Sequence, residues 1–118
     1  DDIIIVTNPE IPAVTDAFKA SKLIDQLGKT VRGVIVTRVR GVKTEMPIAN
    51  IREMLELPII GVIPEDRNMQ SALVLKDAII HTHPKSKASR AYRMIAARIM
   101  GNNSYKEKVG IFEGLFDW

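Results

Sequence analysis

The run Ile3-Ile4-Ile5-Val6 decides how this chain folds, because it is apolar at every position. A strand with one face in water alternates apolar and polar residues, whereas a strand covered on both faces reads as a continuous apolar run. Such a strand belongs inside a parallel sheet that has helices above and below it. The run begins near the first residue with no helix before it, so we expect the chain to be part of a longer domain.

Two further β-branched runs, Gly33 to Val39 and Ile59 to Ile63, repeat this pattern along the chain. The segments between the runs are amphipathic and long enough to form helices. Strands that alternate with helices in this way are typical of βαβ units. The sequence therefore predicts an α/β fold of three layers, in which a parallel sheet carries helices on both faces.

Four helices are predicted from apolar periodicity and from the residues that start and stop helices. Gly28 ends the first of them, Pro47 is expected as the first residue of the second, and Gly101 ends the last. The predicted helices span residues 12–27, 48–55, 65–75 and 88–99. Residues 76–84 are expected to be irregular or extended.

Composition limits the function classes. The chain has 118 residues, a formal net charge of +3 and a pI near 9.3, but its 17 basic residues are interspersed with 14 acidic ones, so nucleic-acid binding is not indicated. It contains no cysteine, which excludes disulfides, thiolate metal ligands and thiol nucleophiles within this sequence. No apolar run approaches the roughly 20 residues that span a bilayer.

Two motifs suggest chemistry that their context does not support. Gly28-Lys29-Thr30 resembles the end of a phosphate-binding loop, but Leu23 stands where that loop needs its first glycine, and the motif follows a helix instead of a strand. Helix termination explains it better. His81 and His83 could point the same way from an extended segment, yet no third metal ligand lies near them in the sequence.

Polar residues follow the second and third strands at the point where each strand ends. They are Thr37-Arg38 and Pro64-Glu65-Asp66. Ligands of open parallel sheets bind beyond the carboxyl ends of the strands, so these two loops are the best candidates for a binding site. On their chemistry alone, the two carboxylates of the second loop fit helix capping better than ligand binding.

The last residues have a character of their own, and we divide the chain into residues 1–103 and a linker with an amphipathic tail at residues 104–118. The bulky apolar residues of the tail are Ile111, Phe112, Leu115 and Phe116. Their spacing places them on one face of a short helix, behind two lysines, which is typical of an interfacial membrane anchor. Docking of the tail on its own domain remains the alternative, because Glu113 and Asp117 oppose binding to anionic lipid.

Several of these segments together resemble the MinD/ParA family of deviant P-loop ATPases, in the carboxyl-terminal half of its MinD-type members. The segments are Ile5-Val6-Thr7-Asn8-Pro9-Glu10, Val36-Thr37-Arg38, Gly61-Val62-Ile63-Pro64-Glu65-Asp66, Ala91-Tyr92, and the Gly-Ile-Phe and Leu-Phe elements of the tail. Their order and spacing make the set more specific than any one of them.

The resemblance implies a doubly wound fold whose loops Thr37-Arg38 and Pro64-Glu65-Asp66 border the adenine of ATP or ADP, bound with Mg²⁺ in the parent protein. It implies a homodimer, division-site regulator proteins that dock on the helix carrying Asp16 and Lys19, and membrane lipid that receives the tail. The expected location is cytoplasmic, peripheral on the inner face of the cell membrane. No nucleic-acid partner is expected.

The resemblance also implies that the phosphate loop, its lysine and the Mg²⁺ ligands of the family precede Asp1. Because hydrolysis requires those groups, we expect this chain alone neither to hydrolyse ATP nor to bind it tightly. Two alternatives stay open: part of a ParA-type DNA-partition ATPase, and a non-enzymatic interaction module. The apolar tail argues against the first, and the upstream sequence would decide the second.

Overall fold

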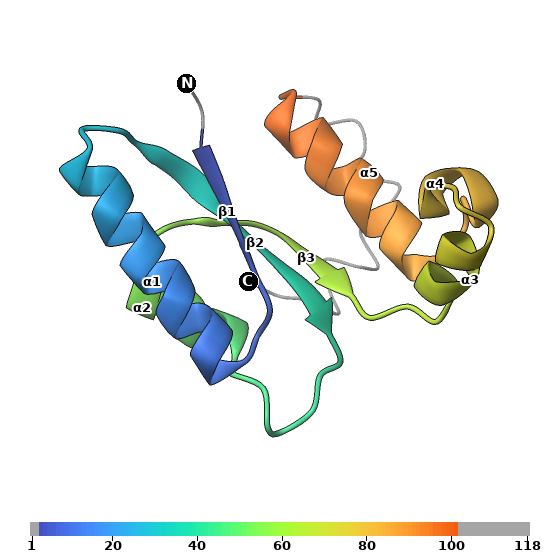
Figure 1. The fold of residues 1–118 in the computed structure, drawn as a ribbon, viewed down its shortest axis with the longest axis horizontal. Helices are drawn as coiled ribbons and strands as arrows, with labels where there is room; N and C mark the ends of the chain where they lie inside the picture. The colour runs from blue at the N-terminus through green and yellow to red at the C-terminus, as the bar shows by residue number, and fades with distance from the viewer. Residues whose placement is uncertain (1–2, 102–118) are drawn as a thin grey trace.

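A computed structural model describes residues 3–101 and has the predicted α/β architecture (Figure 1). The three strands lie in the middle layer, with helices packed on both sides. In chain order the elements are β1 (Ile3–Thr7), α1 (Ile11–Gln26), β2 (Val31–Val39), α2 (Ile48–Leu55), β3 (Ile59–Pro64), α3 (Asn68–Val74), α4 (Ile79–Thr82) and α5 (Lys87–Ile99).

The sheet is parallel throughout and has the order β1-β2-β3. The apolar runs that predicted the strands are those that pair: Ile5 lies opposite Val34, and Thr7 lies opposite Val36. Helices α1 and α2 lie together on one face, while α5 covers the other face beside α3 and α4 (Figure 1). The prediction of a parallel sheet with helices on both faces is confirmed.

Two hydrophobic cores form, one on each face of the sheet. The larger joins all three strands to α1 and α2, and its centre contains Val14, Val34 and Ile51, none of which has exposed surface. The smaller joins β3 to α3, α4 and α5 through Ile63 and Ile95, among others. Apolar residues on both faces of one sheet explain why the strands read as continuous apolar runs.

The helix ends show where sequence patterns were sufficient and where they were not. Gly28 ends α1 as predicted, with a φ of 75° that favours glycine. Pro47 is the residue before α2 and not its first helical residue. Helix α3 begins at Asn68, three positions after the predicted start at Glu65, because 65–67 form the turn that leaves β3.

Residues 76–84 are not wholly irregular, because they contain the short helix α4. Its backbone turn is supported at the start by Asp77, whose carboxylate accepts a hydrogen bond from the Ala78 N–H at 2.7 Å. One turn of helix is too short to produce apolar periodicity, so the sequence pattern missed it.

Among residues 3–101, no helix is long and apolar enough to cross a membrane.

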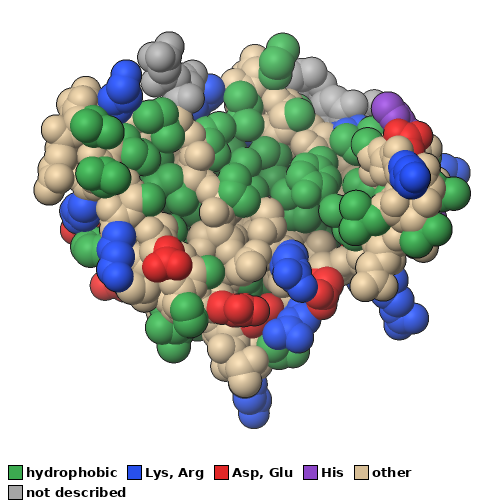
Figure 2. Space-filling model, viewed as in Figure 1, with side chains coloured by type: hydrophobic (Ala, Val, Ile, Leu, Met, Phe, Trp, Pro, Cys, Tyr) green, Lys and Arg blue, Asp and Glu red, His purple; other side chains and the backbone are tan. Residues whose placement is uncertain are grey.

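Strand β1 lies at one edge of the described sheet, and Val6 on it is 60% exposed. Figure 2 shows hydrophobic side chains gathered across the middle of this side of the molecule, where Figure 1 shows β1 between α1 and α5. An edge strand with apolar side chains is a template for pairing with another chain.

We therefore expect the 118-residue chain to associate as its concentration rises, and Val6→Lys to suppress the association by placing a charge on the edge. Sedimentation velocity from low to high micromolar concentration tests this. A single monomeric boundary across the whole range would contradict it, and Val42→Lys, an exposed valine outside the sheet, serves as the control.

Candidate functional site

The carboxyl ends of β2 and β3 border a cavity of about 640 Å³ whose wall is completed by α3 and α5. Both loops that the sequence singled out line it. The lining residues are Thr37, Arg38, Ile63, Pro64, Glu65, Asp66, Arg67, Met69, Gln70, Leu73 and Tyr92. The structure thus brings together two loops that lie 26 residues apart, from Arg38 to Pro64, and we call this cavity the strand-end pocket.

A β-bulge presents the first loop to the pocket. Strand β2 advances from Val36 to Val39 while its partner advances from Val62 to Pro64, so β2 contains one extra residue. Arg38 absorbs the mismatch with a φ of 59°, in the left-handed region that non-glycine residues rarely adopt. Backbone strain of this kind concentrates at functional sites and costs on the order of 1–3 kcal/mol.

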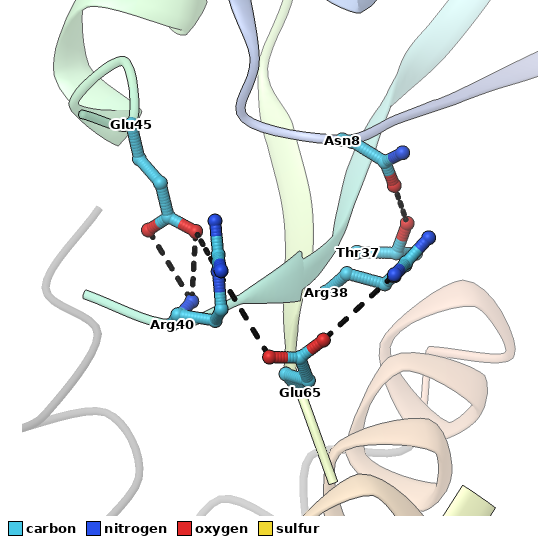
Figure 3. Close-up of polar contacts among 6 residues, drawn as sticks. All are labelled: Asn8, Thr37, Arg38, Arg40, Glu45 and Glu65. Atoms are coloured by element: carbon cyan, nitrogen blue, oxygen red, sulfur yellow. Dashed lines mark hydrogen bonds and ion pairs between the residues drawn. The ribbon is translucent and has the colours of Figure 1, made fainter. Parts of the chain in front are cut away.

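The rim of the strand-end pocket is charged. Glu65 lies 3.8 Å from the Arg38 guanidinium and 3.9 Å from that of Arg40, so one carboxylate bridges two cations (Figure 3). The Arg38 side chain is 72% exposed and that of Glu65 46% exposed, so these ion pairs contribute little to stability. They orient the rim, and both side chains remain accessible to a ligand.

Sequence reasoning missed Glu45, whose side chain is 7% exposed. Its carboxylate accepts a hydrogen bond from the backbone N–H of Arg40 and lies 3.7 Å from Nε of the same residue (Figure 3). It also accepts a hydrogen bond from the Gly41 N–H. These contacts close the loop after β2. No sequence signal marked it, because one glutamate in a polar loop is most simply read as solvated.

Asp66 uses both carboxylate oxygens on backbone groups. One accepts a hydrogen bond from the Asn68 N–H at 2.9 Å, where α3 begins, and the other accepts from the Ala88 N–H at 3.0 Å, in the first turn of α5. Burial opposes the charged form, but these two bonds, with one from Ser86 and the nearby His83, outweigh it and lower the pKa of Asp66. The capping role that the sequence favoured for both carboxylates is confirmed for Asp66, whereas Glu65 pairs with Arg38 and Arg40 instead.

We expect Asp66→Asn to lower the free energy of unfolding at pH 7 by about 1–2 kcal/mol, since an amide N–H₂ would face one of the two backbone donors. Because the folded pKa is lowered, the stabilising effect of Asp66 is present above its ordinary value of 3.8 and is lost as the pH falls through the folded value. The difference between the two proteins should therefore shrink below about pH 4.

Urea denaturation at pH 7 and at pH 3 measures this difference. Asp25→Asn removes the same charge from an exposed position on α1 and is the matched control. An Asp66→Asn protein as stable as the control at pH 7 would show that the two caps contribute nothing.

The other predicted residues lie away from the strand-end pocket. Asp16 and Lys19 are exposed on α1, where Asp16 lines a separate cavity of about 410 Å³ between α1 and β1. His81 lies within α4, with its ring 3.2 Å from Asp77, and the ring of His83 contacts Thr82, so the two histidines do not share an extended segment. Residues 3–101 contain no group of three or more potential metal ligands.

Two arginines of α5 donate hydrogen bonds to backbone carbonyl groups of neighbouring segments. Arg93 donates to the Pro84 carbonyl oxygen, and Arg98 donates to that of Ile60 at 3.0 Å. The predicted membrane residues Ile111, Phe112, Leu115 and Phe116 lie outside the described residues.

The wall and rim of the strand-end pocket suit different parts of a ligand. Ile63, Met69, Leu73 and Tyr92 supply apolar and aromatic surface, while Arg38 and its neighbours supply hydrogen-bonding groups at the mouth. A flat ring system with polar edges fits this division. The strand-end pocket lies beyond the carboxyl ends of β2 and β3. Open α/β sheets bind ligands at this position.

These features define a doubly wound α/β domain with a cavity at its strand ends. The model of the 4Fe-4S iron sulfur cluster binding proteins, NifH/frxC family, matches residues 1–109, and the chain belongs to this family. This chain contains no cysteine. Cysteine thiolates hold 4Fe-4S clusters in proteins, so the residues of this chain do not fit such a cluster.

Two curated relatives are similar over most of the chain. An uncharacterized ATP-binding protein of Methanocaldococcus jannaschii is 38% identical over 101 residues, which are 86% of this chain and 38% of that protein. The septum site-determining protein MinD of Neisseria meningitidis is 31% identical over 132 aligned positions, which cover 98% of this chain and 48% of that protein. The chain therefore spans less than half the length of these relatives.

Solved structures of MinD share the fold. The MinC:MinD cell division protein complex of Aquifex aeolicus superposes with a TM-score of 0.78 at 30% identity, over 86% of this chain and 43% of that one. The septum site-determining protein MinD of Pyrococcus horikoshii, complexed with Mg-ADP, gives 0.77 at 26% identity, over 83% and 40%. The resemblance to MinD that the sequence segments suggested is confirmed.

Proposed function

We propose that the strand-end pocket receives the adenine base of ATP or ADP in a MinD-like ATPase of which this chain supplies the carboxyl-terminal part. The observation that carries the proposal is the convergence of Thr37-Arg38 and Pro64-Glu65-Asp66 on one cavity with an apolar wall. The Mg-ADP named for the Pyrococcus horikoshii protein supports the class of ligand.

In this proposal each group has a limited task. The apolar wall stacks against the faces of the base, Thr37 and Arg38 meet its polar edge and sugar, and the Pro64-Glu65 turn sets the width of the mouth. Asp66 acts through the backbone, because its oxygens hold the turn and the start of α5. The proposal assigns no residue of the pocket to the phosphates.

The phosphates and Mg²⁺ would be held elsewhere in the longer protein. The 118 residues contain no Gly-x-x-x-x-Gly-Lys-Ser/Thr sequence. When bound, Mg²⁺ neutralises charge that develops on the transferring phosphoryl group. This chain contributes the base end of such a site, so ATP hydrolysis and nucleotide-dependent homodimerisation are proposed for the longer protein alone.

We further propose that residues 1–103 belong to the ATPase domain and that residues 104–118 bind the inner face of the cell membrane, which makes the protein cytoplasmic and peripheral. Regulators of division-site placement are its proposed partners, and the exposed positions Asp16 and Lys19 on α1 are where they dock. The MinC:MinD complex named for Aquifex aeolicus supports a partner of that kind.

Titration of the ¹⁵N-labelled chain with nucleosides, followed by ¹H–¹⁵N correlation spectra, tests the base site. We expect millimolar adenosine to shift the amide signals of residues 37–38 and 65–70, and ribose 5-phosphate not to do so. ATP should bind no more than about tenfold more tightly than adenosine, because this chain has no phosphate-binding loop, and should not be hydrolysed.

Arg38→Gly distinguishes ligand binding from folding. Glycine adopts the left-handed conformation of this bulge at no steric cost, so the variant should be as stable as the wild type or more stable, while adenosine binds less tightly. Adenosine shifts scattered over the surface, or located around α1, would refute the proposed site.

A further inference from the structure

Thr37 lines both the strand-end pocket and the cavity of about 410 Å³ between α1 and β1. Its hydroxyl donates a hydrogen bond to Oδ1 of Asn8 at 3.0 Å (Figure 3). Asn8 comes from the end of β1 and has no side-chain atom in the strand-end pocket. The contact therefore links a residue outside the pocket to a polar group on its wall.

The sheet register and the backbone hold Asn8 in this position. Thr7 pairs with Val36, so the residues that follow them, Asn8 and Thr37, lie side by side. The Thr7 hydroxyl donates to the Asn8 carbonyl oxygen at 3.0 Å, and the Pro9 carbonyl oxygen accepts from the Met46 N–H at 2.8 Å. These two bonds hold the backbone at Asn8 and Pro9 in place.

A threonine hydroxyl has one proton to donate and two lone pairs with which to accept. Since the proton of Thr37 is directed at Asn8, what remains for a ligand is a lone pair. A ligand atom that meets Thr37 must then be a donor. The 6-amino group of adenine is a donor, whereas the 6-oxo group of guanine or hypoxanthine is an acceptor.

We propose that Asn8 is a positioning residue that sets the hydrogen-bond polarity of Thr37 and so makes the strand-end pocket select 6-amino purines over 6-oxo purines. This inference rests on the proposed base site. An oxo group facing the Thr37 lone pair would lose a hydrogen bond and leave two acceptors opposed, a penalty that corresponds to about tenfold in affinity.

Dissociation constants of adenosine and inosine for the ¹⁵N-labelled chain, taken from the shifts of the pocket amides, test the proposal. Inosine replaces the 6-amino group by a 6-oxo group and keeps the sugar. The wild type should prefer adenosine by about tenfold. Asn8→Ala leaves the Thr37 hydroxyl able to turn toward the ligand, so the preference should fall to near unity.

A conservative change separates this role from a structural one. Asn8→Asp presents only acceptor oxygens to Thr37 and should restore the preference, while Thr37→Val should abolish it without changing the shape of the wall. Asn50→Ala, an exposed position on α2, is the control and should leave the ratio at its wild-type value.

Other outcomes would refute either the role of Asn8 or the base site itself. If adenosine and inosine bind the wild type equally, or if Asn8→Ala keeps the preference, the role of Asn8 is refuted and the base site stands. A preference for inosine would mean that the Asn8 amide is turned, with its N–H₂ donating to Thr37. Failure of both nucleosides to shift the pocket amides would refute the base site, and with it this inference.

Discussion

Replacement of Gly61 by valine should lower the free energy of unfolding by about 1–3 kcal/mol, the usual cost of overfilling a packed core. Gly61 lies in β3 under α5, and a Cβ atom there would lie 2.1 Å from Cγ1 and 2.4 Å from Cδ1 of Ile95. Ile95 is β-branched and 4% exposed, so it has no other rotamer to adopt without displacing α5.

The same substitution should widen the strand-end pocket, because Tyr92 on α5 forms part of its wall. Ile51→Val is the matched control: it creates a small defect in the core on the opposite face, at a cost of about 0.5–1.5 kcal/mol. Urea denaturation gives the stabilities, and adenosine titration gives the affinities. Equal affinities in the two variants would show that α5 does not set the width of the pocket.

Joining two copies of the tail should produce the largest change in affinity that we predict, and this change is in the affinity for lipid vesicles. We expect one copy of residues 104–118 to bind lipid vesicles weakly, because the burial of four apolar side chains, at about 25 cal/mol per Å², is largely offset by the entropy lost on ordering the segment. Joining two copies makes the second insertion intramolecular and should raise the affinity by roughly 10²- to 10⁴-fold.

Vesicle co-sedimentation of the tail, of a covalently paired tail, and of a paired tail with Phe112→Ala and Phe116→Ala measures this effect. The paired wild-type tail should sediment with vesicles at much lower lipid concentration than the other two. If all three bind equally, the tail is not a membrane anchor, and docking on its own domain becomes the better explanation. If the paired tail with both substitutions binds vesicles as tightly as the paired wild-type tail, the aromatic face is not the membrane contact.

The sheet was predictable because apolar cores form on both of its faces. Strands between two such cores read as uninterrupted apolar runs, and Ile3 to Val6 can be recognised without any structure. The site was predictable to the level of loops, since parallel strands end at the same edge and bring Thr37 close to Pro64. Both inferences depend on apolar periodicity and on the order of strands and helices, and both can be read from the sequence.

What the sequence could not supply are the directions of individual side chains. The bulge at Arg38 arises from a register mismatch between two strands that are distant in sequence. The contact of Asp66 with Ala88 depends on how α5 returns to the sheet, and that of Asn8 with Thr37 depends on the register of β1. Such contacts follow from tertiary packing and leave no local pattern.

Photolabelling tests the central claim, that the ends of β2 and β3 form the base end of a nucleotide site, most directly. The 118-residue chain is irradiated with 2-azidoadenosine, and the modified peptides are identified by mass spectrometry. We predict labels in the peptides that contain residues 37–38 and 64–73, suppressed by excess adenosine and unaffected by ribose 5-phosphate. Labels confined to other peptides, or labels that excess adenosine does not suppress, would contradict the claim.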